Sequence, residues 1–360
     1  MKNCLRTEAH LRALSLLMFC PERSDEPVMH VAGLDEKGLQ EFFWLADAHH
    51  VIVRAIQPLQ HQAHAIGDGR LVTLTQNVLD RERSRITKAL KYLDKVCTRI
   101  TAAGCDVTVI KSLDHWPDFG SDLDLFTAGD ERRLVDVLKK DLHARHCMRT
   151  PGDCVAHKRS FALPGLPERV ELHINRLGPV GEHVKLAKRF VSRSKPATFN
   201  EYTFQMPAPE ERVIAGTLQR MYRNLYVRIC DVFNTAILIE KHMLDFEELR
   251  EVAEEAGIWP GVATFLTLAA DHVNKYRGDL LELPDSVIES SHFGAESTLV
   301  QGGYFRFPAM PYGMGLYVRQ LRHAANSGDI PGAARLSLVP PLASMGALAY
   351  AVTGNSGRVW

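Results

Sequence analysis

Apolar side chains recur every three or four positions through most of the first hundred residues, which is the spacing of one face of an α-helix. Proline and glycine cluster only between the periodic stretches, so the pattern predicts several helices joined by short turns. The same spacing occurs in the first twenty residues, and because Glu8, His10 and Arg12 interrupt the apolar run, we interpret it as an amphipathic helix and not as a signal peptide. Residues 1–103 are therefore predicted to form an N-terminal helical lobe.

The period changes after Gly104, where short β-branched and apolar runs begin. The predicted strands are residues 106–110, 123–126, 155–163 and 169–175. One helix is predicted between them, at 131–142, and a turn containing two prolines and a glycine joins the last two strands. Residues 104–200 are therefore predicted to form a small α/β core.

Helical spacing returns over residues 209–236, which predicts one long amphipathic helix, and a further helix begins near Asp245. Beyond Gly278 the pattern is weak and predicts a loop-rich end. The mostly apolar stretch at 336–352 predicts a buried helix, since it is too short to span a membrane comfortably. With residues 201–360 as a C-terminal helical lobe, the predicted fold class is α+β, with a small mixed-sheet core flanked by two helical lobes.

The chain has 360 residues, of which 46% are hydrophobic and 24% charged, and this ordinary globular composition excludes a disordered or collagen-like chain. Its 43 basic and 43 acidic residues leave no net charge, which argues against a chain-wide attraction to nucleic acid or anionic membranes. The seven cysteines are scattered and include no CxxC pair, as expected for free thiols in a reducing compartment. We therefore expect a cytoplasmic protein without a membrane partner.

Two carboxylates, Asp122 and Asp124, lie two positions apart beside a predicted strand, so their side chains point to the same face of a sheet. Without a cation between them, they would repel each other and raise each other's pKa. By the same alternation, Glu171 and His173 share the polar face of the strand at 169–175. If the two strands are neighbours, Glu171 completes a three-carboxylate site that suits hard divalent cations such as Mg²⁺.

A predicted strand ending in Lys111-Ser112, the sequence Ser-Asp-Leu-Asp-Leu at 121–125, and Val-Glu-Leu-His at 170–173 follow one another in this order. The arrangement resembles the nucleotidyltransferases of the DNA polymerase β-like superfamily, and more closely a bacterial group of uncharacterised nucleotidyltransferase-like proteins with flanking helical lobes. It covers roughly residues 35–260. The matching segments are residues 45–51, 110–112, 121–125, 170–173, 228–232 and 244–249. One departure is the Lys-Ser pair itself, which stands where the superfamily usually has Gly-Gly or Gly-Ser.

This resemblance implies an enzyme that depends on Mg²⁺ or Mn²⁺ and moves a nucleoside monophosphate from a nucleoside triphosphate to an acceptor hydroxyl or phosphate. The implied metal ligands and catalytic residues are Asp122, Asp124 and Glu171. The implied nucleotide-binding residues are Lys111, Ser112, Ser121 and His173. Lys111 and Ser112 are expected to open a short helix whose amides hold the β- and γ-phosphates. His173 is expected to help Glu171 deprotonate the acceptor.

The nature of the acceptor leaves alternatives, of which we favour a small molecule. An RNA or protein acceptor would require a local basic surface, and the candidate is the basic stretch at 185–195 together with Arg220 and Arg223. Nucleic acid is therefore an alternative partner that we do not favour. A third alternative is a nucleotide-binding scaffold without activity, and the departure at Lys111-Ser112 is its support.

Overall fold

The computed structural model describes residues 2–23 and 25–353. The N-terminal part is helical, as the apolar spacing predicts, and Asp35 and Asp68 begin two of the helices by accepting a hydrogen bond from a first-turn N–H group. The helical segments are α1 (Lys2–Phe19), η1 (Pro21–Arg23), α2 (Asp25–Ala32), α3 (Glu36–Ala48), α4 (Ile52–Ala65) and α5 (Gly69–Ala102). Helix α1 confirms the helix predicted at the N-terminus but not its amphipathic character, because residues 13–19 are buried on every side.

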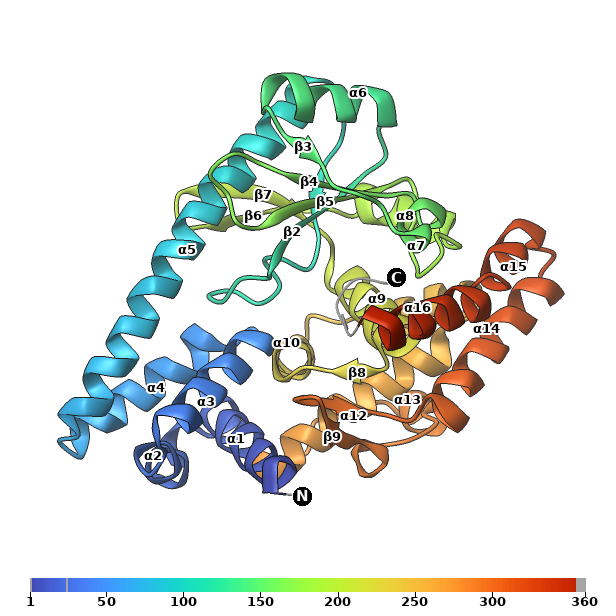
Figure 1. Ribbon diagram of the computed structural model, residues 1–360. Helices are drawn as coiled ribbons and strands as arrows, with labels where there is room; N and C mark the ends of the chain where they lie inside the picture. The colour runs from blue at the N-terminus through green and yellow to red at the C-terminus, as the bar shows by residue number, and fades with distance from the viewer. Residues whose placement is uncertain (1, 24, 354–360) are drawn as a thin grey trace.

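Helix α5 has 34 residues and runs from the N-terminal helices to the sheet (Figure 1). Leu71 and Leu79 near its start pack in the same core as the N-terminal helices. Leu90 and Val96 in its second half pack in the core of the sheet. Because helical spacing does not reveal which body a helix packs against, the sequence pattern alone assigns all of α5 to one lobe.

A five-stranded sheet follows α5, with the strand order β1-β2-β5-β4-β3. Strands β2 and β5 are parallel, and the other neighbouring pairs are antiparallel. The strands are β1 (Thr108–Val109), β2 (Asp122–Thr127), β3 (Arg145–His146), β4 (Lys158–Ala162) and β5 (Arg169–Ile174). The chain therefore combines α and β structure around a small mixed sheet, as predicted.

The segments between β2 and β5 differ from the prediction in two places, the first being β3, which was not predicted. They contain α6 (Glu131–Asp136), the π-helical turn η2 (Val137–Asp141) and α7 (Pro151–Val155). The first two confirm the helix predicted at 131–142. The strand predicted at 155–163 begins three residues later, at the start of β4, because Thr150 and Asp153 exchange hydrogen bonds that begin α7.

A helix and a hairpin complete the sheet region. They are α8 (Val184–Ser192), β6 (Lys195–Phe199) and β7 (Tyr202–Met206), the two strands being antiparallel. Phe204 and Met206 are buried in the core of the five-stranded sheet. The core therefore extends a few residues past the predicted boundary at 200.

The long helix predicted over 209–236 is wrong, because the chain breaks it in the middle. Leu225 has a left-handed backbone (φ 54°), and the next two residues pair with a later strand, β10 (Tyr304–Arg306). Met221 and Val227 are buried on either side of the break, so the apolar spacing continues through it. The elements of this region are α9 (Pro209–Gln219), the π-helical turn η3 (Arg220–Asn224), β8 (Tyr226–Val227), α10 (Ile229–Glu240), α11 (Phe246–Glu255) and α12 (Trp259–Arg277).

The loop-rich end predicted beyond Gly278 is also wrong, since short helices and strands occupy most of it. These are α13 (Asp285–Ser290), η4 (Ala295–Ser297), β9 (Leu299–Gln301), β10, η5 (Ala309–Gly313), α14 (Met314–Asn326), α15 (Ile330–Leu336) and α16 (Val339–Thr353). Helix α16 covers most of the apolar stretch but is not buried, because Met345 and Leu348 are 57% and 69% exposed. Across the described residues, every helix is too short or too polar to traverse a bilayer.

Two large hydrophobic cores organise most of the described elements, and a small third cluster holds α15 and the start of α16 against Val180 and Ala324. In the first, Leu14 and Phe42 of the N-terminal helices pack in one cluster with Val262 and Leu266 of α12, so the two helical lobes form a single helical body. The second core combines the sheet, the second half of α5 and the β6–β7 hairpin. In Figure 1 the sheet lies above the helical body, and the polar cavity described below is lined by residues of both.

Candidate active site

The predicted acidic residues lie on the two parallel strands. The register of β2 and β5 sets Asp124 beside Glu171 and Asp122 beside Arg169. Leu123 and the other alternate residues of both strands are buried in the core of the sheet. The polar residues consequently share the opposite face, as the period-two alternation predicts.

Asp124, Glu171 and His173 form a cluster in which one ligand atom from each lies within 4.8 Å of the others. Nε2 of His173 is 2.9 Å from Oε1 of Glu171 and 3.3 Å from Oδ1 of Asp124. Asp122 is the third ligand that the sequence implies, but it is not part of this cluster among the described residues. It lines the same cavity at the start of β2, where the hydroxyl of Ser121 donates to its carboxylate at 3.4 Å. The third donor of the cluster is thus an imidazole.

Two lysine side chains neutralise the clustered carboxylates. Nζ of Lys111 is 2.5 Å from Oδ1 of Asp124, and Nζ of Lys158 is 2.7 Å from Oε1 of Glu171. Burial opposes ionisation of Asp124, but the Lys111 ammonium and the hydrogen bond from His173 outweigh it and lower the pKa of this carboxyl. Burial likewise opposes ionisation of Glu171, yet Lys158 and His173 hold its pKa well below the ordinary value. The expected repulsion is therefore relieved by the chain's own cations.

The protonation of the neighbouring groups follows from the same surroundings. Burial and the positive charges of Lys158 and Lys111 lower the pKa of His173, so its imidazole is neutral near pH 7. Because its two close acceptors are carboxylates, Nε2 carries the hydrogen. Burial and the charge of Arg223 lower the pKa of Lys158 to about 8, although Glu171 acts against them. The site thus contains one neutral donor and an ammonium group that loses its proton slightly above neutral pH.

The turn after β1 does not contain the short helix expected at Lys111 and Ser112. Residues 111–117 form a bend and turns, and Lys111 has a left-handed backbone (φ 62°), which favours glycine. The hydroxyl of Ser112 donates to the carbonyl of Asp122 and accepts from the amide of Asp124, each at 2.8 Å. Ser112 therefore connects the turn to β2 through two hydrogen bonds, and its hydroxyl hydrogen is already donated to the carbonyl of Asp122. Both Lys111 and Ser112 line the cavity described next.

A polar cavity of about 280 Å³ lies over the acidic face of β2 and β5. The sheet contributes to its lining Lys111, Ser121, Asp122, Asp124 and Glu171. The helical body contributes three arginines, which we call the arginine wall: Arg220, Arg223 and Arg228. The cavity therefore brings carboxylates and guanidinium groups together, an arrangement that suits a negatively charged ligand bound with a cation.

None of the three arginines was among the predicted site residues, since Arg220 and Arg223 were named only for the alternative basic surface, and the break after α9 explains why. The η3 turn and the backbone of Leu225 bring Arg220 and Arg228 to the same cavity. Arg220 is 2% exposed, and its Nε lies 2.6 Å from Oδ2 of Asp231. Sequence patterns assign arginine to the surface, so no sequence signal marked Arg220 as a buried site residue.

A second group of metal-ligating side chains, His115, Cys230 and Asp231, adjoins the arginine wall, and its His115 also lines the cavity. Its donors are engaged, since Arg220 contacts both oxygens of Asp231 and the amide of Asn234 donates to Nδ1 of His115 at 2.7 Å. Burial and the charge of Asp231 raise the pKa of the Cys230 thiol, which keeps it protonated. We interpret this group as a polar network that supports the arginine wall.

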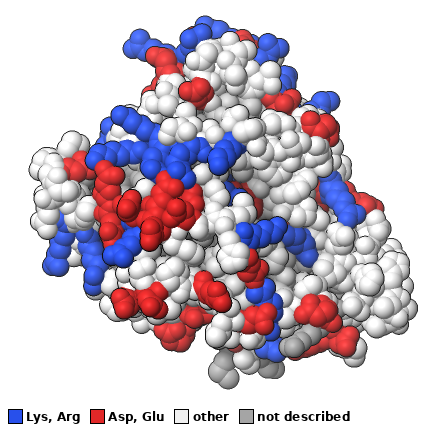
Figure 2. Space-filling model, turned by 180° about the vertical axis from the view of Figure 1, so that it is seen from behind, with Lys and Arg blue, Asp and Glu red and all other residues white. Residues whose placement is uncertain are grey.

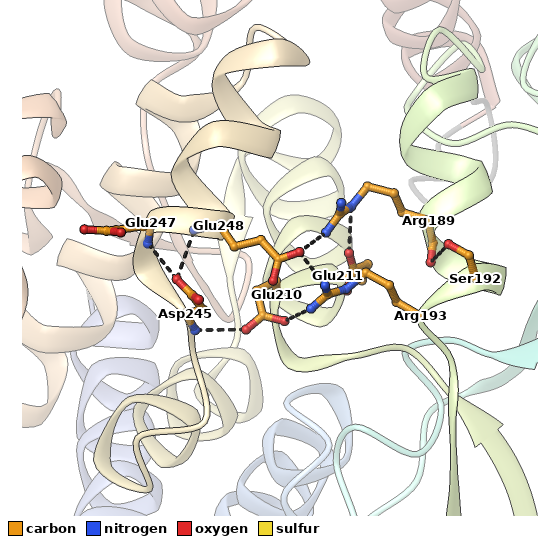
Figure 3. A network of polar contacts seen from close by, with 8 residues as sticks. All are labelled: Arg189, Ser192, Arg193, Glu210, Glu211, Asp245, Glu247 and Glu248. Carbon is orange, nitrogen blue, oxygen red and sulfur yellow. Dashed lines mark hydrogen bonds and ion pairs between the residues drawn. The ribbon is translucent and has the colours of Figure 1, made fainter.

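The basic stretch at 185–195 lies on and just after α8, and its main charges are paired. On the face drawn in Figure 2, basic side chains lie directly beside acidic ones. Figure 3 shows Arg189 and Arg193 pointing into a group of carboxylates from α9 and α11. These carboxylates are Glu210, Glu211 and Glu248. Lys185 pairs with Glu255 at 2.6 Å. The stretch therefore lacks the row of available cations that a polynucleotide backbone requires.

We expect single-stranded RNA to bind only weakly near physiological ionic strength, because few cations of this surface are free to replace counterions. The measurement is fluorescence anisotropy of a labelled oligonucleotide as the salt concentration is raised. A plot of the logarithm of the affinity against the logarithm of the salt concentration should have a slope shallower than about −2, because each phosphate that the protein neutralises contributes about −0.7. A steep slope that Lys188→Ala with Arg189→Ala abolishes would contradict this expectation.

No family model, curated protein or solved structure matches the chain.

Proposed function

We propose that the protein is a nucleotidyltransferase that uses Mg²⁺ or Mn²⁺ to move a nucleoside monophosphate from a nucleoside triphosphate to an acceptor. The observation that carries the proposal is the pairing of Asp124 with Glu171 on parallel strands that line one cavity with the arginine wall. The order of motifs, which resembles the DNA polymerase β-like nucleotidyltransferases, supports the same reaction. The proposed partners are a nucleoside triphosphate and a small acceptor.

The donor set fits a divalent ion after a local rearrangement. Asp124 and Glu171 offer carboxylate oxygens, and His173 offers Nε2 once that nitrogen has lost its hydrogen. Lys111 and Lys158 must then turn away from the carboxylates, which their long flexible side chains allow. A bound ion supplies positive charge at the α-phosphate and lowers the pKa of the acceptor hydroxyl.

In the proposed reaction, an acceptor oxygen forms a bond to the α-phosphorus while the bond to the bridging oxygen of the β-phosphate breaks, and pyrophosphate leaves. Glu171 takes the acceptor proton and passes it to solvent, since its side chain is 23% exposed. Lys111, once released from Asp124, contacts the phosphates. Asp122 shares the cavity with Asp124 and is proposed to help hold a second ion.

The imidazole in the cluster leads to a prediction about metal preference. Mg²⁺ strongly prefers oxygen ligands, whereas Mn²⁺ more readily accepts a nitrogen ligand. We expect Mn²⁺ to support faster turnover than Mg²⁺ at equal concentrations, and His173→Gln to reduce this preference because it replaces the nitrogen by an amide oxygen. Initial rates with each ion measure the ratio. An equal preference in the wild type and the variant would contradict a role for His173 as a ligand.

The activity itself is tested with nucleoside triphosphates labelled at the α-phosphate. Each is incubated with the protein and Mn²⁺ or Mg²⁺, alone and with fractionated cell extract, and both pyrophosphate release and label transfer are measured. We expect label to enter a small-molecule fraction. Transfer to RNA or protein would instead support the macromolecular alternative, and no release with any triphosphate in any fraction would contradict the proposed function.

A second candidate, a nucleotide-binding scaffold without activity, is favoured by one observation. Both carboxylates of the cluster are already paired with ammonium groups, those of Lys111 and Lys158, which is the arrangement expected where no metal is needed. Under this alternative, the triphosphate raises the melting temperature equally with and without a divalent ion. Under the nucleotidyltransferase proposal, the ion strengthens the effect.

We also propose that the acceptor is small and that the protein is cytoplasmic. The pairing of Arg189 and Arg193 with glutamates supports the first statement, because it removes the best candidate surface for RNA. The second is supported by the cysteines, none of which forms a disulfide among those the structure describes.

A further inference from the structure

We infer that Arg220 and Arg228 form a phosphate subsite in the polar cavity, and that the acceptor is a phosphorylated small molecule. The assignment to the acceptor rests on the proposed function, whereas anion binding by the two arginines does not. The subsite belongs to the helical body, and the metal-ligating cluster belongs to the sheet.

Hydrogen-bond donors of both arginines are buried without a partner. Nη1 of Arg220 and Nε of Arg228 have no hydrogen-bond acceptor among the described residues. Buried guanidinium N–H groups are costly to leave unpaired, and both side chains line the cavity. These two nitrogens are closed to solvent, so an oxyanion in the cavity would supply the missing acceptors after a small shift of the two side chains. Gln219 and Asn224 also line the cavity, and a phosphate offers three or four acceptor oxygens to such a set of polar side chains where a carboxylate offers two, so we commit to phosphate.

The local charge balance points to the same ligand. Arg220 is paired with Asp231, whereas the guanidinium of Arg228 makes its close contact with Nε2 of His50. Burial lowers the pKa of His50 well below its ordinary value, and the charge of Arg228 adds to the effect, so this imidazole is neutral. Burial likewise lowers the pKa of His115 to about 3. Arg220 thus has a carboxylate partner, whereas Arg228 has none within ion-pair distance among the described residues, and an anion in the cavity could supply one.

An aromatic pair holds the arginines in place. The rings of Tyr226 and Tyr304 stack with their centroids 4.3 Å apart. The guanidinium carbons of Arg220 and Arg228 lie 5.4 and 5.9 Å from the centroid of Tyr226. Because stacking restricts both side chains before any ligand binds, less conformational entropy is lost on binding.

Arg306 provides a matched control. Its guanidinium carbon lies 5.0 Å from the same Tyr226 centroid, but Arg306 is not among the described residues that line the cavity. Arg306→Gln therefore removes an equivalent stacking contact and charge without removing a donor from the subsite.

The test is a titration of the metal-free protein with inorganic phosphate, followed by ³¹P NMR. We expect saturable binding that Arg228→Gln weakens about 10- to 100-fold, the value of a charged hydrogen bond. Arg306→Gln should bind phosphate like the wild type. Arg228→Lys keeps the charge, so it should weaken phosphate binding less than Arg228→Gln. The lysine variant also tests the role of Arg228 if the glutamine variant does not fold.

Two further titrations identify the chemical class of the ligand. Repeating the titration with saturating ATP and Mg²⁺ should leave phosphate binding unchanged, whereas displacement by ATP would assign the arginines to the triphosphate and overturn the acceptor assignment. Acetate should bind more weakly than phosphate, and equal binding would overturn the choice of phosphate. Absence of phosphate binding, or equal loss in the Arg306 variant, would overturn the subsite itself. If only the proposed reaction is wrong, phosphate binding persists while label transfer is absent.

Discussion

Replacing Asp124 by asparagine is expected to reduce metal-dependent pyrophosphate release by at least about 1,000-fold, because a metal-ligating carboxylate contributes several kcal/mol to the stabilisation of charge in the transition state. The carboxylate of Asp124 contacts both Lys111 and His173. Its replacement by an amide therefore removes the negative charge that these two side chains share. The measurement is the initial rate of release with saturating Mn²⁺, in the extract fraction that supplies the acceptor.

Asp136→Asn is the control for this variant, since Asp136 is 59% exposed in the same α/β region and pairs only with the surface Lys140 among the described residues. It should leave the rate unchanged. Asp124→Asn should also lower the melting temperature slightly in metal-free buffer, because it leaves the ammonium of Lys111, which is 16% exposed, without its partner. Activity of the Asp124 variant within tenfold of the wild type would contradict the proposed role.

The second large effect concerns stability, and it is expected from Asp231→Ala. Arg220 is 2% exposed and Asp231 is its paired carboxylate, so the alanine variant leaves a buried guanidinium without a counter-charge. Breaking such a pair costs about 3–5 kcal/mol in the free energy of unfolding. The change is measured by urea denaturation as a shift of the midpoint at constant slope.

Glu254→Ala is the matched control, because Glu254 pairs with Arg250 across one helical turn and both side chains are about half exposed. Its loss should change the free energy of unfolding by no more than about 0.5 kcal/mol. A destabilisation by Asp231→Ala as small as that by Glu254→Ala would contradict this prediction. It would mean that the position of Arg220 in the cavity does not depend on its ion pair with Asp231.

The acidic half of the site is visible in the sequence because its cause is local. Asp124 and Glu171 each alternate with buried leucine or valine residues, and period-two alternation determines which face a side chain occupies. The parallel pairing of the two strands then brings the faces together. His173 is on the same face for the same reason, although its place beside the carboxylates depends on the register.

The positions of the arginines and of Lys111 in the site depend on backbone features that residue types in the sequence do not reveal. Leu225 has a left-handed backbone, and leucine does not mark such a position as glycine does. The break that it makes turns Arg220 inward, against the usual preference of arginine for the surface. Lys111 likewise occupies a left-handed position, and its pairing with Asp124 joins residues from two strands. Such contacts follow from tertiary structure and not from spacing.

The central claim is that Asp124 and Glu171 hold a divalent ion, and the most direct test is a titration with Mn²⁺ followed by electron paramagnetic resonance. The signal of free Mn²⁺ should decrease as the ion binds to the wild-type protein, and this saturable loss should disappear in Asp124→Asn combined with Glu171→Gln. Asp136→Asn should titrate like the wild type. Saturable Mn²⁺ binding that survives in the double variant, or no saturable binding in the wild type, would contradict the claim.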